Sequence, residues 1–223
     1  MDESSFNGVV IFDMDGIIVD SEQLWDDARE ELVKEVGGRW GAGAQRAMMG
    51  MSSNEWSVYV RDELEVPLSA EEINVEVVGR LLTKYEEHLP LLPGAVEVVR
   101  AVGARWPLAL ASSSNREVID HVLEIAGITD QFVATVSSEE VGRGKPAPDV
   151  FIAAAKELRA APADCVVIED SGNGIRAGIA AGMRVVAAPN RDFPPDPDAI
   201  ALAHVVVEHV ADISVDTIEE AAA

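Results

Sequence analysis

Residues 9–16 read Val9-Val10-Ile11-Phe12-Asp13-Met14-Asp15-Gly16, and this stretch decides the fold. The run of four apolar residues is typical of a fully buried strand. Two carboxylates and a glycine follow at once, at the point where open α/β sheets bind their ligands. Two like charges about 4 Å apart repel by roughly 4 kcal/mol at an effective dielectric near 20. The pair of aspartates therefore indicates a metal ion, a shared proton or a nucleophile.

The chain is strongly acidic, with 40 acidic and 17 basic residues among 223 and a net charge of −23. Nucleic acids and anionic membrane surfaces are bound through basic patches, so both are disfavoured as partners. An anionic substrate would need a local cation to reverse this field. No apolar run approaches the ~18 residues of a membrane helix, and we expect a cytoplasmic protein. The single cysteine, Cys165, excludes an internal disulfide.

Short apolar runs alternate with helical patterns through most of the chain. Strands are predicted at 9–12, 108–111, 132–136, 165–168, 185–188 and 205–207. Helices are predicted at about 94–104, 116–126, 148–158, 172–182 and 214–221, and residues 191–197 are predicted to form a loop. This alternation predicts an α/β fold with a mainly parallel sheet.

Between Asp20 and Pro93 the pattern changes to helices alone, predicted at about 22–36, 44–50, 54–63 and 69–87. Ser69 and Glu72 have the spacing of a capping box. We expect residues 21–90 to form a small helical cap, and residues 1–20 and 91–223 to form the α/β catalytic core. The prolines of the return segment, residues 88–94, make it a candidate hinge.

Four short motifs stand at predicted strand ends or in the loops beyond them: Asp13–Gly16, Ser112–Asn115, Gly142–Pro148 and Glu169–Gly172. Each alone is weak evidence, because acidic and serine residues at strand ends commonly cap turns and helices. Together they form one chemical set. Carboxylate oxygens suit Mg²⁺, which also binds substrate phosphate, while hydroxyls, backbone N–H groups and Lys145 suit phosphate oxygens.

The four motifs resemble, in order and spacing, the signature of the haloacid-dehalogenase-like hydrolase superfamily over about residues 8 to 190. The residues that carry this resemblance are Asp13–Ser21, Ser112, Gly144–Pro146 and Glu169-Asp170. The run Lys145–Phe151 is similar to the sugar-phosphate phosphatase and β-phosphoglucomutase branch. The resemblance implies a Rossmann-like three-layer parallel core with an inserted small α-helical cap.

The resemblance also implies roles for individual residues. Asp13 would be the nucleophile that forms an aspartyl-phosphate, and Asp15 would be the general acid and base. The implied Mg²⁺ ligands are Asp13, the Asp15 carbonyl and Asp170. Glu169 would either bind the ion itself or support the residues that do. The implied phosphate-binding residues are Ser112, Ser113 and Lys145. The expected activity is hydrolysis of a small phosphomonoester, such as a sugar or alditol phosphate.

Other activities stay open at this point. A phosphosugar mutase shares all four motifs, but Trp25 stands where the mutase pattern has histidine, and Ser53 aligns with its phosphate-binding arginine. The run Ser21–Trp25 resembles hexose- and hexitol-phosphate phosphatases, which favours hydrolysis. The acid at Asp15 disfavours dehalogenation, and the insertion at 21–90 disfavours a phospho-accepting signalling module. A catalytically silent binding protein is disfavoured by the complete motif set. The sequence indicates no oligomeric state.

Overall fold

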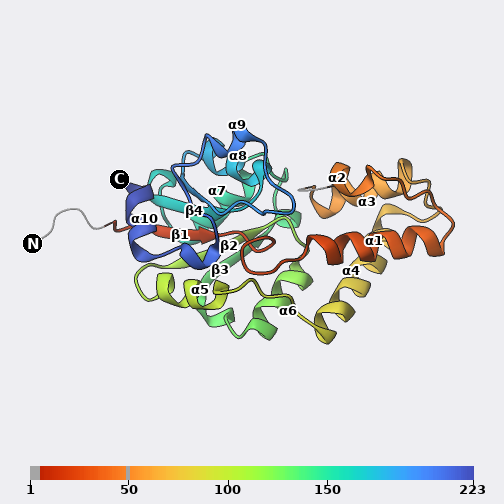
Figure 1. The fold of residues 1–223 in the computed structure, drawn as a ribbon, viewed down its shortest axis with the longest axis horizontal. Helices are drawn as coiled ribbons and strands as arrows, with labels where there is room; N and C mark the ends of the chain where they lie inside the picture. Colours follow the sequence, from red (N-terminus) through yellow and green to blue (C-terminus); the bar gives the residue numbers. More distant parts are fainter. Residues whose placement is uncertain (1–5, 49–50) are drawn as a thin grey trace, which may run out of the picture.

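The protein is described by a computed structural model that covers residues 6–48 and 51–223. Six parallel strands form one sheet in the order β3-β2-β1-β4-β5-β6 (Figure 1). The strands are β1 (Val9–Phe12), β2 (Leu108–Ser112), β3 (Phe132–Ser137), β4 (Cys165–Glu169), β5 (Arg184–Ala187) and β6 (Val205–Val206). Each overlaps a predicted strand. The first strand along the chain thus lies in the interior of the sheet, between β2 and β4.

Helices cover both faces of the sheet. Side chains alternate along β1, so Val10 and Phe12 enter one apolar cluster while Val9 and Ile11 enter the other. The first cluster contains side chains of α5 (Ala95–Gly103), α6 (Arg116–Ala126) and α10 (Val215–Ala222). The second contains side chains of α7 (Asp149–Glu157) and α8 (Gly172–Ala180). The predicted Rossmann-like three-layer α/β fold is confirmed.

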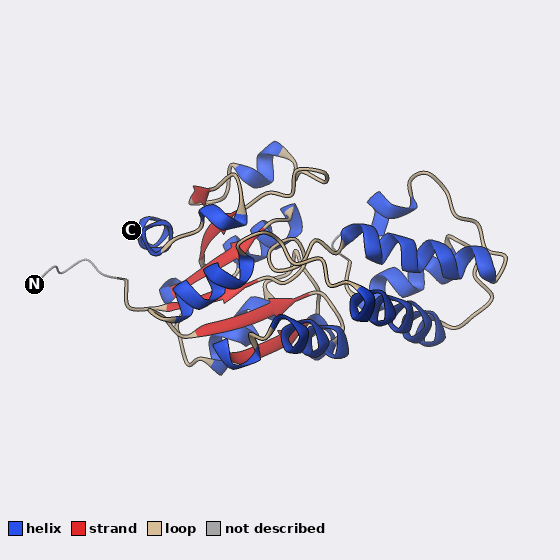
Figure 2. Cartoon of the chain, turned by 60° about the horizontal axis from the view of Figure 1, so that its bottom comes forward, coloured by secondary structure: helices blue, strands red, loops and turns tan. Residues whose placement is uncertain are grey.

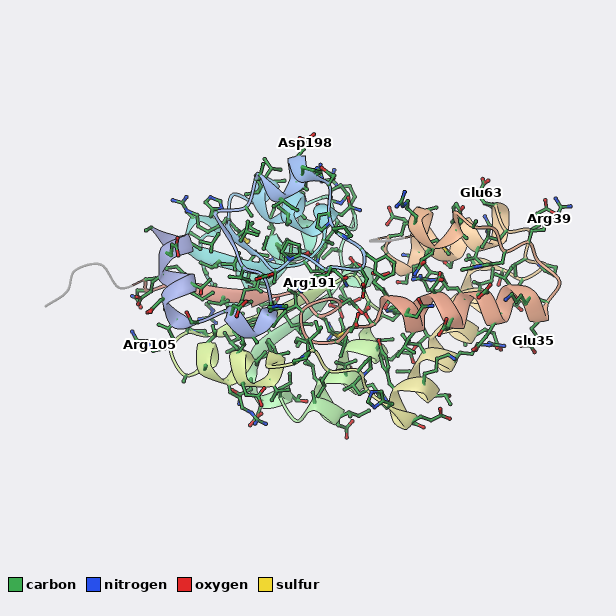
Figure 3. All side chains as sticks on the ribbon, viewed as in Figure 1. Glu35, Arg39, Glu63, Arg105, Arg191 and Asp198 are labelled. Atoms are coloured by element: carbon green, nitrogen blue, oxygen red, sulfur yellow. The ribbon has the colours of Figure 1, made fainter. Side chains whose placement is uncertain are left out.

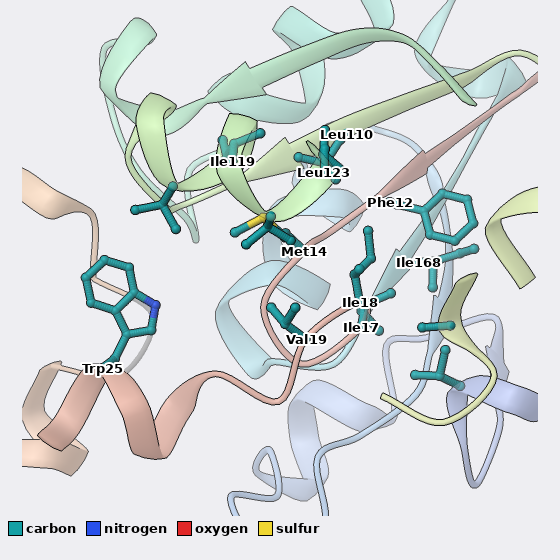
Figure 4. Close-up of a cluster of buried hydrophobic side chains, with 14 of the residues drawn as sticks. Phe12, Met14, Ile17, Ile18, Val19, Trp25, Leu110, Ile119, Leu123 and Ile168 are labelled. Carbon is teal, nitrogen blue, oxygen red and sulfur yellow. The ribbon is translucent and has the colours of Figure 1, made fainter. Parts of the chain in front are cut away.

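The turn after β1 completes the first cluster. Met14, Ile17, Ile18 and Val19 are fully buried there (Figure 4). The same figure shows Trp25 apart from these residues, at the start of the next helix. The apolar cluster continues from the sheet into that helix, so the core and the insertion share packing.

The insertion between β1 and α5 contains α1 (Glu22–Glu35), α2 (Ala44–Met48), α3 (Ser53–Asp62) and α4 (Ala70–Glu87). These helices pack on one another in a lobe beside the sheet, which confirms the inserted helical cap (Figure 2). The capping box at Ser69 is present, since Ser69 and Glu72 exchange hydrogen bonds of 2.8 and 3.2 Å. The last two residues of the predicted helix 44–50 lie outside the described part. The domain limits at 20/21 and 90/91 stay a prediction.

The two chain segments that connect cap and core run side by side. The N–H of Asp20 donates to the Pro90 carbonyl at 2.9 Å, and the N–H of Leu92 donates to the Ile18 carbonyl at 2.9 Å. A β-bridge pairs Val19 with Leu91 between them. Both crossings therefore form one short paired connection.

A second contact between cap and core is polar and centres on Glu139. Its Oε1 accepts hydrogen bonds from Ser53 Oγ at 3.0 Å and from Asn115 Nδ2 at 2.7 Å. Asn115 also donates to Asn74 of the cap at 3.2 Å. Ser53, the residue aligned with the mutase arginine, is thus buried in the contact between cap and core.

Short elements outside the six strands were only partly predicted. Helix α9 (Pro197–Ile200) begins at the end of the predicted loop, where Asp196 accepts a hydrogen bond from the Ala199 N–H at 2.9 Å. An aspartate before a proline is a typical helix start, so the signal was present in the sequence. Four single 3₁₀ turns lie at 129–131, 138–140, 162–164 and 210–212. None of the described helices combines the length and apolar composition needed to cross a bilayer.

Most of the charged side chains are exposed. Glu35, Arg39 and Glu63 lie at the end of the cap farthest from the sheet (Figure 3). Exposed ion pairs such as Arg39–Glu65, at 2.8 Å, contribute about 0–1 kcal/mol, because water solvates the separate ions well. Charges that are buried therefore need a separate explanation; among the described residues, four gather at one edge of the sheet, and Asp26 and Arg29 lie on α1 of the cap.

Candidate active site

Neighbouring strands bring the predicted residues together. The order β2-β1-β4 is parallel, so Ser112, Asp13 and Glu169-Asp170 come to the same edge of the sheet. This edge faces the cap (Figure 1). Lys145 reaches it from the loop between β3 and α7. The sequence motifs, far apart along the chain, thus form one site.

Gly16 makes the approach of the first and last motifs possible. Its φ of +78° lies in the left-handed region, and a Cβ atom there would stand 2.0 Å from Asp170 Oδ2. Any side chain would collide with this carboxylate. A glycine after the aspartate pair is therefore required on steric grounds.

Four ionisable side chains are buried together at this edge, each at most 7% exposed: Asp13, Lys145, Glu169 and Asp170. The ammonium of Lys145 lies 2.8 Å from Asp13 Oδ1 and 2.8 Å from Glu169 Oε1. It also stands over the Phe151 ring, 4.8 Å from the centroid. One cation therefore holds two of three buried carboxylates.

The surroundings raise the pKa of all three of Asp13, Asp170 and Lys145, which favours the neutral form of the two acids and the charged form of the lysine. Burial raises the pKa of Asp13 well above its usual value against the pull of Lys145, and burial together with Glu169 raises the pKa of Asp170. Burial alone would lower the pKa of Lys145, but Asp13 and Glu169 outweigh it and raise that pKa. The ammonium is therefore charged. The single positive charge of Lys145 does not fully stabilise the ionised forms of the carboxylates.

Glu169 is already fully engaged. Besides the Lys145 contact, its Oε2 accepts hydrogen bonds from the Ser171 N–H at 2.6 Å and the Ser171 hydroxyl at 3.0 Å. A Cβ atom at Gly174 would stand 1.5 Å from Glu169 Oε1, so the first turn of α8 closes around this carboxylate. Glu169 thus fixes the position of Lys145 and of the loop that carries Asp170.

The cluster fits a divalent cation. One carboxylate oxygen from each of Asp13, Glu169 and Asp170 can be chosen so that all lie within 4.8 Å of one another. Asp13 Oδ1 is buried and, although close to Lys145, receives no well-directed hydrogen bond. Three carboxylates and one ammonium leave two negative charges if all are ionised. Oxygen donors of this kind are the ligands of Mg²⁺ and Ca²⁺.

The Asp15 carboxylate turns away from this cluster and is held by donors from two sides. Ser21 Oγ and Trp25 Nε1 donate to its Oδ1, the latter at 3.3 Å. Ser114 Oγ donates to Oδ2 at 2.7 Å and Ser112 Oγ at 3.2 Å. Asp13 and Asp15 therefore have separate environments, Asp13 beside a cation and Asp15 among neutral donors.

A cavity of about 240 Å³ lies between the core and the cap. Asp13, Asp15, Lys145, Asp170 and Ser113 line it, together with Ser114. Ser112 is fully buried and is not among the described lining residues, and its hydroxyl is bonded to Asp15. Ser114 belongs to the motif Ser112–Asn115 but is not among the predicted site residues, although it lies two residues after Ser112.

The cap forms the opposite wall of the cavity. Its described lining includes Glu22, Trp25, Arg29, Met48 and Trp56. Sequence reasoning gave no role to Arg29 and Glu22, and no local motif marks them. The one available signal is their spacing: Glu22 lies three residues before Trp25 and Arg29 four residues after it. Residues three or four apart share a helix face, so this spacing predicts both on the same side of α1 as Trp25.

The fold and the site define a class of hydrolase, and comparison with known proteins identifies it. A family model described as haloacid dehalogenase-like hydrolase matches residues 8–182, well over half of the chain. The chain belongs to this family. This confirms the family that the sequence motifs predicted.

Individual relatives agree with this assignment. The chain is 33% identical over 210 residues to Hexitol phosphatase B of Escherichia coli O157:H7, covering 92% of this chain and 93% of that protein. It is 32% identical to a bifunctional riboflavin kinase/FMN phosphatase of Arabidopsis thaliana, over 93% of this chain but only 54% of that protein. The chain thus spans about half the length of this second relative. A β-phosphoglucomutase structure from Clostridium difficile has the same fold, with a TM-score of 0.83, 24% identity and 96% coverage of each chain.

The raised pKa of Asp170 predicts that its charge destabilises the metal-free protein. We expect Asp170→Asn to be more stable than wild type at pH 7, by on the order of 1 kcal/mol. The gain should shrink on acidification, because the wild-type carboxyl regains its proton as pH falls through the raised folded-state pKa. Urea unfolding in EDTA at pH 7 and at lower pH measures both effects.

The exposed Asp62→Asn substitution serves as the control and should not stabilise the protein at either pH. Added Mg²⁺ should raise the stability of wild type and not of Asp170→Asn. A less stable Asp170→Asn protein in EDTA at pH 7 would contradict this account.

Proposed function

We propose that this protein is a Mg²⁺-dependent phosphatase that hydrolyses a small phosphomonoester through an aspartyl-phosphate on Asp13. One observation carries the proposal: the Asp13 carboxylate lies at the cavity wall, 2.8 Å from the Lys145 ammonium. The Asp15 carboxylate faces the same cavity two residues later. A nucleophile, a phosphate-binding cation and a proton carrier therefore meet in one cavity.

The reaction proceeds in two steps on these residues. An Asp13 carboxylate oxygen attacks phosphorus, the ester P–O bond breaks, and Asp15 donates a proton to the leaving alcohol oxygen. Water then attacks the aspartyl-phosphate while Asp15 accepts a proton from it. The bond between phosphorus and Asp13 breaks, which releases inorganic phosphate and restores the carboxylate.

Lys145 and Ser113 bind the phosphoryl group, and Ser112 supports them. An ammonium has three N–H donors. Asp13 and Glu169 occupy two directions around Lys145, which leaves the third for a phosphoryl oxygen. Ser113 lines the cavity and supplies a further donor. Ser112 acts mainly through Asp15 and the Ser114 N–H, to which its hydroxyl is bonded.

The carboxylates of Asp13 and Asp170, with the Asp15 carbonyl, would hold Mg²⁺, and Glu169 would support them from its bonds to Lys145 and Ser171. The bound metal supplies positive charge that neutralises the phosphoryl oxygens in the transition state. The cavity residues themselves orient the ester and carry the proton.

Hydrolysis of a sugar or alditol phosphate is favoured over phosphosugar transfer. The E. coli relative is named for a hexitol phosphate activity, and the chain matches nearly its whole length. In the mutase pattern, the arginine at the position of Ser53 holds a second phosphate while the sugar reorients. Ser53, at the position aligned with the mutase arginine, instead donates to Glu139. The substrate is a small phosphorylated metabolite in either case.

Replacing the nucleophile should abolish turnover. Asp13→Asn keeps the shape of the side chain but removes its charge, so no aspartyl-phosphate can form. We expect loss of phosphate release, measured with Mg²⁺ and a panel of phosphomonoesters, with the unfolding transition retained. Asp130→Asn is the matched control, because Asp130 is exposed and lies before the first residue of β3, at the edge of the sheet away from the site. Turnover by a clean Asp13→Asn preparation would exclude the mechanism.

Replacing Asp15 should slow turnover by about 10²–10⁴-fold, the usual contribution of general acid–base catalysis. Asp15→Asn is the suitable variant, since its amide oxygen can still accept hydrogen bonds from the donors on one side, and the serine hydroxyls on the other side can rotate to accept from its NH2 group. The loss in the first step should be smaller for p-nitrophenyl phosphate, whose leaving group needs little protonation. Rapid-quench measurement of the two substrate types gives the comparison. An equal loss for both would remove Asp15 from the role of acid.

The choice between phosphatase and mutase is open to direct measurement. The protein should release inorganic phosphate from several phosphorylated sugars and alditols in a Mg²⁺-supplemented screen. Given β-glucose 1-phosphate with a bisphosphate primer, it should form little glucose 6-phosphate, which coupled dehydrogenase assay detects. Rapid formation of glucose 6-phosphate would replace the phosphatase assignment with a mutase.

A further inference from the structure

Arg29 of α1 is a buried cation in the cap wall of the cavity. The residue is 6% exposed. Its guanidinium carbon lies 5.0 Å from the centroid of the Trp25 ring and 5.0 Å from that of the Trp56 ring. The two rings themselves are 5.9 Å apart. The guanidinium is therefore fixed by two aromatic neighbours in contact with the cavity.

Among the residues that the structure describes, the donors of this guanidinium have no partner. Within the described part of the chain, Arg29 forms no hydrogen bond and no ion pair within 4.0 Å, and its buried Nε has no partner. Elsewhere on the cavity wall, Arg176 is satisfied by Asp196, at 2.9 and 3.1 Å. Arg29 thus differs from the other cavity arginine in having donors available.

The acidic groups around Arg29 do not neutralise it. Glu22 lines the same cavity, and Asp26 lies on the same helix, but neither comes within ion-pair distance. Burial lowers the pKa of Arg29 to about 10 although Glu22, Asp26 and Asp15 act to raise it, so it is still charged at neutral pH. An unpaired charge in a buried position is costly, and a ligand that pairs with it removes that cost.

The chemistry of the group specifies the ligand. A guanidinium presents planar N–H donors that match carboxylate and phosphate oxygens in pairs. The two indole centroids, each 5.0 Å from the guanidinium carbon, are 5.9 Å from each other, so both rings lie on the same side of the guanidinium. Arg29 also lines the cavity, where its donors can meet a ligand. Lys145 lies on the core wall of the same cavity and is already assigned to the reacting phosphate. A substrate that fills the cavity would therefore meet two cationic centres, one at each wall.

We propose that Arg29 is a specificity-determining residue that binds a second anionic group of the substrate, a carboxylate or a phosphate, at the end away from the reacting phosphate. This inference rests on the proposed phosphatase function and narrows its substrate class to phosphomonoesters with an additional negative charge. Trp25 and Trp56 position the guanidinium for this contact.

The test uses matched linear substrates that differ only at the far end: glucitol 6-phosphate, 6-phosphogluconate and glucitol 1,6-bisphosphate. The set is repeated with four-carbon analogues, to allow for the length of the cavity. Wild type, Arg29→Gln and Arg176→Gln are compared by kcat/KM. The ratio of kcat/KM for two substrates of the same variant does not depend on the fraction of that preparation that is active.

In wild type, kcat/KM should be about 10-fold or more higher for a substrate with an anionic far end than for the neutral alditol phosphate. In Arg29→Gln, kcat/KM for the anionic substrate should fall by about 10- to 100-fold, the effect of one charged hydrogen-bond pair. Arg176→Gln should keep the preference. The carboxylate and bisphosphate arms show which anion is bound. A retained preference in Arg29→Gln, or no preference in wild type at either length, would overturn the inference.

Binding separates this inference from the proposed function. Trp25 and Trp56 lie beside the guanidinium, so docking of an anion there should change tryptophan fluorescence even without turnover. Titration of the same compounds into Asp13→Asn, and into the double variant Asp13→Asn/Arg29→Gln, measures affinity alone. A preference for the anionic compounds that depends on Arg29 would support the inference if no hydrolysis occurs. Equal affinities in both proteins would refute it.

Discussion

The ammonium of Lys145 stands between the carboxylates of Asp13 and Glu169, 2.8 Å from an oxygen of each, and the rest of the site depends on this contact. Buried carboxylates without a partner would repel one another and take up protons. Lys145 permits three of them to share one sheet edge. It can do so because the loop after β3 crosses the ends of β1 and β4, and because Glu169 is in turn anchored by Ser171.

Asp15 connects the two walls of the cavity. It accepts hydrogen bonds from Ser112 and Ser114 of the core motif and from Ser21 and Trp25 at the start of the cap. The position of the proposed proton carrier thus depends on both parts. The short paired connection at 18–20 and 90–92 keeps these parts in register. The acidic field of the chain is countered only locally, by Lys145 on one wall and, as we infer, by Arg29 on the other.

Much of the fold could be predicted because its signals are local. The run Val9–Phe12 predicted β1 with the correct limits, and apolar runs predicted all five other strands within about a residue of their observed ends. The change from mixed to purely helical patterning predicted the cap. The motifs also implied which residues share the site, because parallel strands deliver their carboxyl ends to one edge. Helix α9 was missed, although Asp196 and Pro197 signalled its start.

The amino-acid sequence by itself therefore determined the sheet, the inserted helices and the chemical groups at the strand ends, since each follows from neighbours along the chain. Only the tertiary structure decided how those groups are used. It bonds Ser112 to Asp15, commits both oxygens of Glu169, and brings Trp56 of α3 beside Trp25 and Arg29. These partners lie on segments far apart in sequence, so their contacts depend on how helices and strands pack, which no local pattern encodes.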